Sequence, residues 1–362
     1  MINPILNKIN RGFLLPSSAI TIKRKYINYY KYDTKKPEAG DLVYGVVTRI
    51  GHHSSLEHTS GRLHRIQDGT RSIFVFGNRY APDQFEGQLP DNMTDKAEIL
   101  SQSGVVGIVK TKNALMKDPT RVKILGYVCD SSNRILNTRS MSIIKPRLQH
   151  KRIPRSPMIL ICGTSMNSGK SMAATACCWA LNTLGYKVRA AKITGTAGLK
   201  DILHMNDAGA EHYADFSYLG FPSTYKLSMD ELLHIFNTID LKYANNPKNF
   251  WVVEFADGII QRETAMLLGS HEVQSRIDKL IFCANDAFGA IGGLRVLKER
   301  FGLIPDAISG ICSSSPLSIK ELADYSTLPV FRSVNINIDL MKSILLSPVR
   351  SSVDFNLSAL AG

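Results

Sequence analysis

Long apolar runs, paired cysteine motifs and low-complexity tracts are all missing from this chain of 362 residues. No uninterrupted apolar stretch reaches about 18 residues, so no membrane-spanning helix is expected. The six cysteines form no CxxC pair, which excludes a zinc motif or a disulfide framework. Several lie in apolar stretches, where a reduced thiol packs as a small hydrophobic group, so we expect a cytoplasmic protein. The 44% of hydrophobic residues leaves ample material for a packed core and excludes disorder of the whole chain.

Acidic residues are scarce in the first part of the chain. Residues 1–156 hold 26 Lys and Arg against 12 Asp and Glu, a net charge of +14, whereas residues 157–362 hold 18 and 19, a net charge of −1. The total of +13 therefore originates before residue 157. A basic half attracts nucleic acid, anionic lipid or an anionic small-molecule substrate, and a plain solvated surface is the alternative.

The first 144 residues divide into an arm and a β-rich region. Residues 1–40 are polar and basic and predict a poorly specified arm. Over residues 41–144, short runs rich in Val, Ile, Phe and Tyr alternate with glycines and polar turns, which predicts a small basic β-rich, barrel-like domain. One short helix is predicted over residues 95–103. The predicted strands are Leu42–Ile50, Ser72–Phe76, Val105–Lys110 and Val122–Val128.

The pattern changes after a linker. Residues 145–156 contain two prolines and five basic residues without apolar periodicity. Over residues 157–362, strands alternate with helices, which predicts an α/β domain with a parallel sheet flanked by helices. The predicted strands are Pro157–Cys162, Lys187–Ile193, Phe250–Phe255, Lys279–Ala284 and Ala307–Cys312, and the predicted helices are Lys170–Leu184, Asp230–Thr238 and Ile291–Arg300.

A phosphate-binding loop is predicted between the first strand and the first helix of this domain. Backbone N–H groups at a helix start form a nest for phosphate oxygens, and Gly169 allows a close approach of the backbone. Lys170 can reach the β- and γ-phosphates, and the Ser171 hydroxyl can bind Mg²⁺. A chance Gly-Lys-Ser at a helix start is the alternative, since Thr164 replaces the first Gly of the plain motif. The predicted nucleotide-binding residues are Gly163, Thr164, Asn167, Ser168, Gly169, Lys170 and Ser171.

The pattern Gly-Thr-x-x-x-x-Gly-Lys-Ser at 163–171 resembles the variant Walker A motif of dethiobiotin synthetase and its relatives in the SIMIBI class of P-loop proteins. The resemblance extends over roughly residues 157–335. It implies an enzyme that uses ATP or GTP with Mg²⁺, and it also implies a homodimer. The implied catalytic residues are Lys170, Lys192 and Glu254, and the implied magnesium ligands are Ser171, Asp207 and Glu254.

The residues carried over from that resemblance also have plainer interpretations. Glu254 can be a surface acid at a strand end, Asp207 a helix N-cap, and Lys192 a solvated lysine. Asp201 and Asp257 compete for the magnesium role.

A second resemblance is to the DUF1611 family, on Thr194-Gly195-Thr196-Ala197-Gly198 and the later Asp215-Phe216. It implies an acyltransferase on the same scaffold, with the loop cradling the phosphates of an acyl-CoA. Nearby, Arg262 and Glu263 form either a substrate clamp or the start of a helix.

Three functions therefore remain open at this point. The first is a Mg²⁺-dependent P-loop enzyme that uses ATP or GTP to activate a small anionic substrate by ligase or kinase chemistry. The second is the acyl-CoA-dependent transferase. The third is a nucleic-acid-associated NTPase in which residues 1–156 form the binding module.

Overall fold

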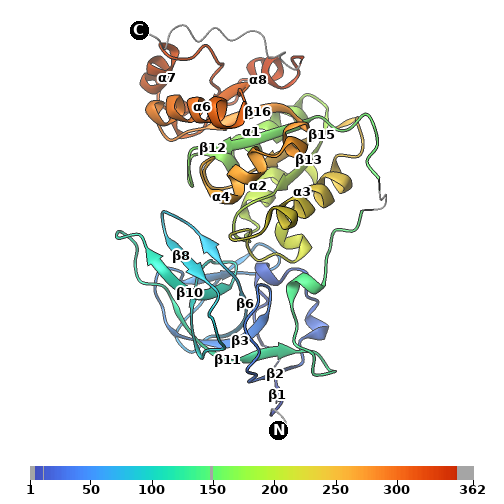
Figure 1. Ribbon diagram of the computed structural model, residues 1–362, viewed down its shortest axis with the longest axis vertical. Helices are drawn as coiled ribbons and strands as arrows, with labels where there is room; N and C mark the ends of the chain where they lie inside the picture. The colour runs from blue at the N-terminus through green and yellow to red at the C-terminus, as the bar shows by residue number, and fades with distance from the viewer. Residues whose placement is uncertain (1–4, 11, 147–149, 349–362) are drawn as a thin grey trace. The chain divides into compact units, whose positions relative to one another are not determined.

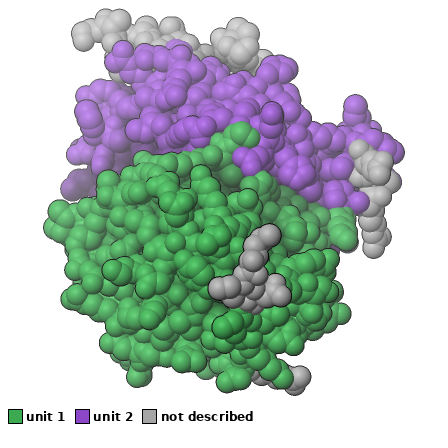
Figure 2. Space-filling model, turned by 60° about the horizontal axis from the view of Figure 1, so that its bottom comes forward, with its two compact units in different colours: residues 1–145, 195–200, 214–228 green, residues 146–194, 201–213, 229–362 purple. Residues whose placement is uncertain are grey.

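The computed structural model describes residues 5–10, 12–146 and 150–348. Parts of the predicted arm, linker and last domain, namely residues 1–4, 11, 147–149 and 349–362, lie outside the described residues. The chain forms two compact units (Figure 2). Over the ranges that the structure describes, no helix has both the length and the apolar character needed to cross a membrane. Unit 1 comprises residues 1–145, 195–200 and 214–228, and unit 2 comprises residues 146–194, 201–213 and 229–362.

A closed ring of five strands forms the core of unit 1, which confirms the predicted barrel-like domain (Figure 1). β11 pairs with β3, β3 with β6, β6 with β10, β10 with β9, and β9 with β11. Closure leaves no free edge within the ring. The strands of unit 1 are β1 (Asn7–Lys8), β2 (Tyr29–Lys31), β3 (Leu42–Arg49), β4 (Ser55–Glu57), β5 (Leu63–Arg65), β6 (Arg71–Phe76), β7 (Arg79–Tyr80), β8 (Phe85–Gln88), β9 (Lys96–Ile99), β10 (Val105–Lys112) and β11 (Arg121–Cys129).

Strand β9 occupies the segment where the sequence predicted a short helix over residues 95–103, so that prediction was wrong. Ala97 and Ile99 are buried, whereas Lys96 is exposed and Glu98 is half-buried. This period of two places both apolar side chains inside the barrel, and a helix would not. Pairing with β10 and β11 therefore decides the conformation of the segment.

The described residues between 5 and 40 belong to unit 1 and do not form a separate arm. Their apolar side chains pack against one end of the outer face of the barrel, and β1 and β2 extend the sheet beyond β11. The residues of this cluster are Ile9, Phe13, Leu15, Ala19, Ile22, Ile27, Leu42, Tyr44, Ile73, Val75, Val128 and Leu136. The apolar positions before residue 40 follow neither helical nor strand periodicity, so the sequence pattern did not show them as core residues.

Two further segments of unit 1 come from the region that the sequence placed in the 157–362 domain. Residues 195–200 and 214–228 pair with each other through a bridge between Thr196 and Ser223. The Thr138 hydroxyl donates to the Gly220 carbonyl at 2.6 Å, across 82 positions of sequence. A local sequence pattern cannot show contacts between residues so far apart. The boundary predicted at residues 145–156 therefore marks only the first point at which the chain leaves unit 1 for unit 2.

Unit 2 is a six-stranded sheet flanked by helices, which confirms the predicted α/β class (Figure 1). The strand order is β14-β13-β15-β12-β16-β17, and the pairs from β13 to β17 are parallel. All six residues of β12 are buried, as expected of a strand covered on both faces. The strands are β12 (Met158–Gly163), β13 (Lys187–Lys192), β14 (Ala210–Asp215), β15 (Asn249–Glu254), β16 (Ile277–Cys283) and β17 (Ala307–Ser309). The helices are α1 (Lys170–Thr183), α2 (Lys200–Asp207), α3 (Met229–Tyr243), α4 (Arg262–Leu268), α5 (His271–Gln274), α6 (Ala287–Phe301), α7 (Pro316–Ala323) and α8 (Ile338–Leu345).

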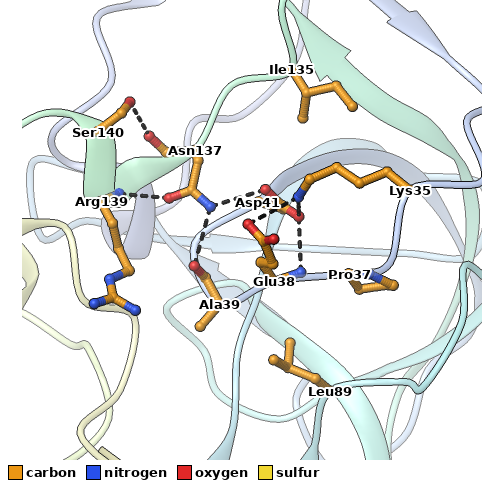
Figure 3. Close-up of a pocket in the computed structure, with 10 residues that line it drawn as sticks. All are labelled: Lys35, Pro37, Glu38, Ala39, Asp41, Leu89, Ile135, Asn137, Arg139 and Ser140. Carbon is orange, nitrogen blue, oxygen red and sulfur yellow. Dashed lines mark hydrogen bonds and ion pairs between the residues drawn. The ribbon is translucent and has the colours of Figure 1, made fainter.

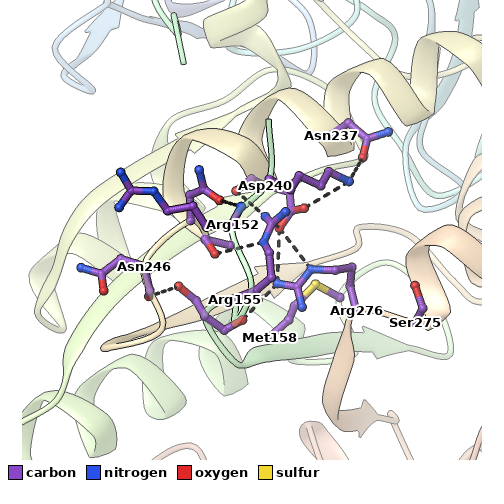
Figure 4. A network of polar contacts seen from close by, with 12 residues as sticks. Arg152, Arg155, Met158, Asn237, Asp240, Asn246, Ser275 and Arg276 are labelled. Carbon is purple, nitrogen blue, oxygen red and sulfur yellow. Dashed lines mark hydrogen bonds and ion pairs between the residues drawn. The ribbon is translucent and has the colours of Figure 1, made fainter. Parts of the chain in front are cut away.

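The end of the predicted linker is fixed to unit 2 by a buried carboxylate (Figure 4). Asp240 of α3 is fully buried, and its Oδ1 lies 2.5 Å from an Arg155 nitrogen and 3.3 Å from Arg276. Its Oδ2 faces the Lys151 amine at 3.6 Å. A carboxylate removed from water needs such compensation. Residues 151–156 are therefore part of the structure of unit 2.

Candidate functional site

The loop that the sequence predicts to bind phosphate lies between β12 and α1. Gly169 precedes the helix with a left-handed φ of +92°, and Asn167 has a φ of +61°. At Gly163, a Cβ would lie 2.6 Å from the backbone carbonyl oxygen of Cys283, so glycine is needed where the end of β12 approaches β16 this closely. The first N–H groups of α1 have no acceptor within the helix and are available to an anion.

Neighbouring segments fix the shape of this loop. The Thr164 N–H donates to the Cys283 carbonyl of β16 at 2.9 Å, and the Ile311 N–H donates to the Ser168 carbonyl at 3.2 Å. Gly310 has a φ of +97°, and a Cβ there would lie 2.3 Å from the Ser168 carbonyl oxygen. Strand β17 therefore ends at Ser309, before the predicted Cys312, because the chain must turn sharply beneath the loop.

Lys170 directs its amine into the loop. The side chain is only 5% exposed, and its Nζ donates to the Ser165 carbonyl at 2.6 Å and lies 3.4 Å from the Ser168 hydroxyl. Both acceptors belong to the loop itself. A buried ammonium held over a nest of backbone N–H groups gives this site a strong preference for an anion.

Glu254 at the end of β15 is brought against Ser171. The Ser171 hydroxyl donates to Glu254 Oε1 at 3.0 Å. Glu254 is 2% exposed, and its Oε2 has no hydrogen-bond partner among the described residues. Burial raises the pKa of Glu254 above its usual range, and the nearby Lys192 and Lys170 oppose the rise. Glu254 is therefore not the exposed strand-end acid of the plainer interpretation.

Lys192 lies directly opposite Glu254 on the adjacent strand β13. Its amine forms an ion pair with Asp201, in the first turn of α2. Lys192 is accordingly a buried and paired residue, in contrast to the solvated lysine that was the alternative interpretation. Asp201 is thus the acid of α2 that lies beside the loop.

Asp207 is placed elsewhere. It is the exposed last residue of α2, six positions after Asp201 and about 9 Å further along the helix axis. It is not a helix N-cap either, because it ends the helix. Of the three implied magnesium ligands, the structure brings Ser171 and Glu254 together. Within the described ranges, no three His, Cys, Asp or Glu side chains gather closely enough to hold a metal by themselves.

The chain after β15 packs on the other side of the loop, and the sequence pattern gave it no such role. The Ile259 N–H donates to the Gly163 carbonyl at 2.9 Å, and a Cβ on Gly258 would lie 2.2 Å from the Thr164 carbonyl oxygen. The glycine at position 258 is the feature of the sequence that could have indicated this close packing. Further on, Glu263 is fully buried in the first turn of α4 and contacts Arg262 at 2.6 Å, so this pair does begin a helix.

A cavity of about 670 Å³ lies in unit 1 (Figure 3). Its charged groups neutralise one another. The Lys35 amine lies 2.6 Å from Asp41 and 3.2 Å from Glu38, and the Asn137 amide donates to the second Asp41 oxygen at 2.9 Å. These polar groups on the wall of the cavity are therefore engaged within the protein.

Comparison with known proteins identifies no family for this chain. No family model matches, and no curated protein matches. Among solved structures, the chain is similar to the signal recognition particle receptor FtsY from Elizabethkingia anophelis in complex with GDP, with a TM-score of 0.36, 9% identity and coverage of 55% of this chain and 66% of that chain. It is also similar to chloroplast FtsY from Physcomitrella patens, with a TM-score of 0.35, 12% identity and coverage of 54% and 63%. The match spans somewhat less than two thirds of either FtsY chain. Likeness at this level identifies no ligand or activity for this chain, which depend on the site residues themselves.

Proposed function

We propose that unit 2 binds the Mg²⁺ complex of a nucleoside triphosphate at residues 163–171 and transfers or hydrolyses its terminal phosphoryl group. The observation that supports this most directly is Glu254. A carboxylate that is 2% exposed, with one oxygen bonded to Ser171 and the other without a hydrogen-bond partner, is poorly stabilised by the protein alone. A cation beside Ser171 would stabilise it.

The donor atoms suit magnesium. Mg²⁺ prefers oxygen ligands and keeps several waters, so one hydroxyl, one carboxylate and the phosphate oxygens of a nucleotide form a sufficient set. Ser171 and Glu254 would hold the ion, which when bound neutralises charge on the phosphates. Among the described residues no group of three His, Cys, Asp or Glu side chains could hold the ion alone, which agrees with an ion that arrives with the nucleotide.

The remaining residues orient and stabilise the phosphates. Lys170 exchanges its contact with the Ser165 carbonyl for a phosphate oxygen, which places a positive charge where negative charge develops. Lys192, held by Asp201 next to Glu254, positions the acceptor of the phosphoryl group. A small anionic acceptor suits this second cation, which gives ligase or kinase chemistry of the dethiobiotin synthetase type as the finer proposal.

The test is nucleotide binding by full-length protein, measured by calorimetry with ATP and GTP in the presence of Mg²⁺. Lys170→Ala should weaken binding by about 2–3 kcal/mol, or roughly 30- to 150-fold, because a charge-assisted hydrogen bond to phosphate is lost. Lys187→Ala, at an exposed lysine of β13, is the matched control and should leave affinity unchanged. Equal affinity of wild type and Lys170→Ala would refute the proposal.

A thermal-shift panel separates this proposal from the acyl-CoA alternative. A ligand that binds only the folded state raises the melting temperature, and the rise grows with the logarithm of its concentration relative to its dissociation constant. We expect a shift with ATP or GTP that requires Mg²⁺. A shift with acetyl-CoA alone would instead support an acyltransferase that uses the same loop for the phosphates of coenzyme A.

A further inference from the structure

The outer face of the barrel in unit 1 has two ends of opposite character. At one end, Leu42, Tyr44 and Ile73 are buried beneath the segment that precedes residue 40. Further along the same strands, outward positions carry cations, and all of these are exposed. We call the second end the cationic barrel face, defined as Arg49, Arg71, Lys96, Arg121 and Lys123.

Strand register places these cations in rows. Lys96 of β9 lies directly opposite Lys123 of β11, Lys123 lies opposite Val46 of β3, and Val46 lies opposite Arg71 of β6. In the next row, Arg121 of β11 lies opposite Arg49 of β3 on one side and opposite Glu98 of β9 on the other. Neighbouring strands are about 4.8 Å apart, so these rows hold positive charges close together over four strands, with the neutral Val46 between Lys123 and Arg71.

The protein itself does not neutralise these rows. None of the five cations forms an ion pair with any residue that the structure describes. Like charges directly opposite each other destabilise a sheet, and both the Lys96–Lys123 and Arg49–Arg121 pairs have this arrangement. These like-charge pairs weaken the isolated fold. A bound anion would relieve their repulsion, which is a reason for the protein to keep them.

The acidic groups at the border of this face are already engaged. Glu98 accepts from the Val109 N–H at 2.9 Å, and Asp68 accepts from the Ile50 N–H at 3.0 Å. Asp118 forms its ion pair with Lys112 at 2.7 Å, and Lys112, Arg49 and Arg121 together lower the pKa of this exposed carboxyl. Bonds from neutral N–H groups leave Glu98 and Asp68 charged, and the exposed Asp95 precedes Lys96, so these four acids partly offset the five cations and Lys112, which still outnumber them.

We propose that the cationic barrel face binds the phosphodiester backbone of nucleic acid. Arginine and lysine side chains on neighbouring strands suit a line of phosphates. Two of the five cations are lysines, and the other three are arginines, whose planar guanidinium groups bind phosphate in a bidentate way. None of the exposed large apolar side chains in the described residues lies on β3, β6, β9 or β11, so these strands offer nothing to insert among lipid chains or to stack on bases. Binding is therefore independent of base sequence.

The test uses full-length protein without nucleotide and a fluorescein-labelled duplex of about 20 base pairs, measured by anisotropy between about 50 and 200 mM NaCl. Five phosphate contacts predict a slope of about −4.5 in a plot of log affinity against log salt concentration. Lys96→Gln/Lys123→Gln should weaken binding about ten- to a hundredfold and reduce the slope by about two. Lys23→Gln/Lys25→Gln removes the same charge from other exposed lysines of unit 1 and should have a much smaller effect.

A further variant adds a second readout, the melting temperature, which does not depend on duplex binding. Lys123→Glu converts a repulsive cross-strand pair with Lys96 into an attractive one, so it should raise the melting temperature, and it should weaken duplex binding at least as much as the double glutamine variant does. Absence of binding at about 50 mM salt, equal losses in the two double variants, or binding to phosphatidylserine vesicles but not to duplex would overturn the proposal. Nucleotide hydrolysis by unit 2 has no part in these measurements, so the two proposals fail separately.

Discussion

Two buried carboxylates of unit 2, Asp240 and Glu254, are treated by the fold in opposite ways. Asp240 is fully buried and lies within reach of three cations, Arg155, Arg276 and Lys151. Glu254 is also buried, and each of the two carboxylates has one oxygen without a hydrogen-bond partner among the described residues. At Asp240 that oxygen lies 3.6 Å from the Lys151 amine, whereas the hydrogen bond to Glu254 comes from a neutral hydroxyl. We call the first arrangement complete, because cations of the protein balance it, and the second incomplete, because we propose that a bound cation balances it.

The largest effect should come from breaking the complete arrangement. Asp240→Ala leaves two arginines that are each at most 14% exposed without their carboxylate, and we expect a loss of about 3–5 kcal/mol in the free energy of unfolding. Urea denaturation measures this. Glu299→Gln removes the acid of an exposed pair with Arg295 and should cost less than about 1 kcal/mol. If both variants lose the same small amount, the Asp240 network does not stabilise the fold.

A change at the incomplete arrangement should affect activity and leave stability intact. Glu254→Gln keeps the shape and the Ser171 contact but removes the buried charge, so the free energy of unfolding should stay within about 1 kcal/mol of wild type or rise. Under the proposed function, single-turnover nucleotide hydrolysis should fall about a hundredfold, because the Mg²⁺ would lose a charged ligand. A stability loss as large as that of Asp240→Ala would show that Glu254 is structural.

The pH dependence of stability gives a smaller effect with a definite sign. Since the pKa of Glu254 is raised in the folded state, the native protein binds the proton more tightly than the unfolded chain, whose glutamate titrates near 4.3. Stability therefore falls as pH rises from about 4 through the raised pKa. The melting-temperature difference between Glu254→Gln and wild type should widen over this range without nucleotide. A constant difference would contradict the direction of the shift.

Features encoded by adjacent residues could be predicted from the sequence. The apolar run of β12, the Gly169-Lys170-Ser171 triplet and the helix after it are determined locally, and the loop lies where expected. The barrel strands β3, β6, β10 and β11 are also apparent from their Val, Ile and Phe content. In β9, by contrast, four residues are too few to establish a period.

Features that depend on distant partners could not be predicted. The choice between Asp201 and Asp207 follows from where α2 begins relative to Lys192, which the spacing along the chain does not specify. The contact of Arg155 with Asp240 joins residues 85 positions apart. In each case the side chain acquires its role from tertiary packing.

Because unit 1 consists of three separate segments of the chain, its folding cannot be completed until the third segment has been synthesised. When residue 145 leaves the ribosome, the strands of the barrel are present, but the carbonyl of Gly220 that accepts from Thr138 does not yet exist. Another 83 residues must be synthesised before residue 228 is reached, which takes about 4–17 s at roughly 5–20 residues per second. During that interval β12, α1 and β13 emerge. The unit that begins first therefore finishes only after translation of its neighbour is under way, so the two mature in parallel.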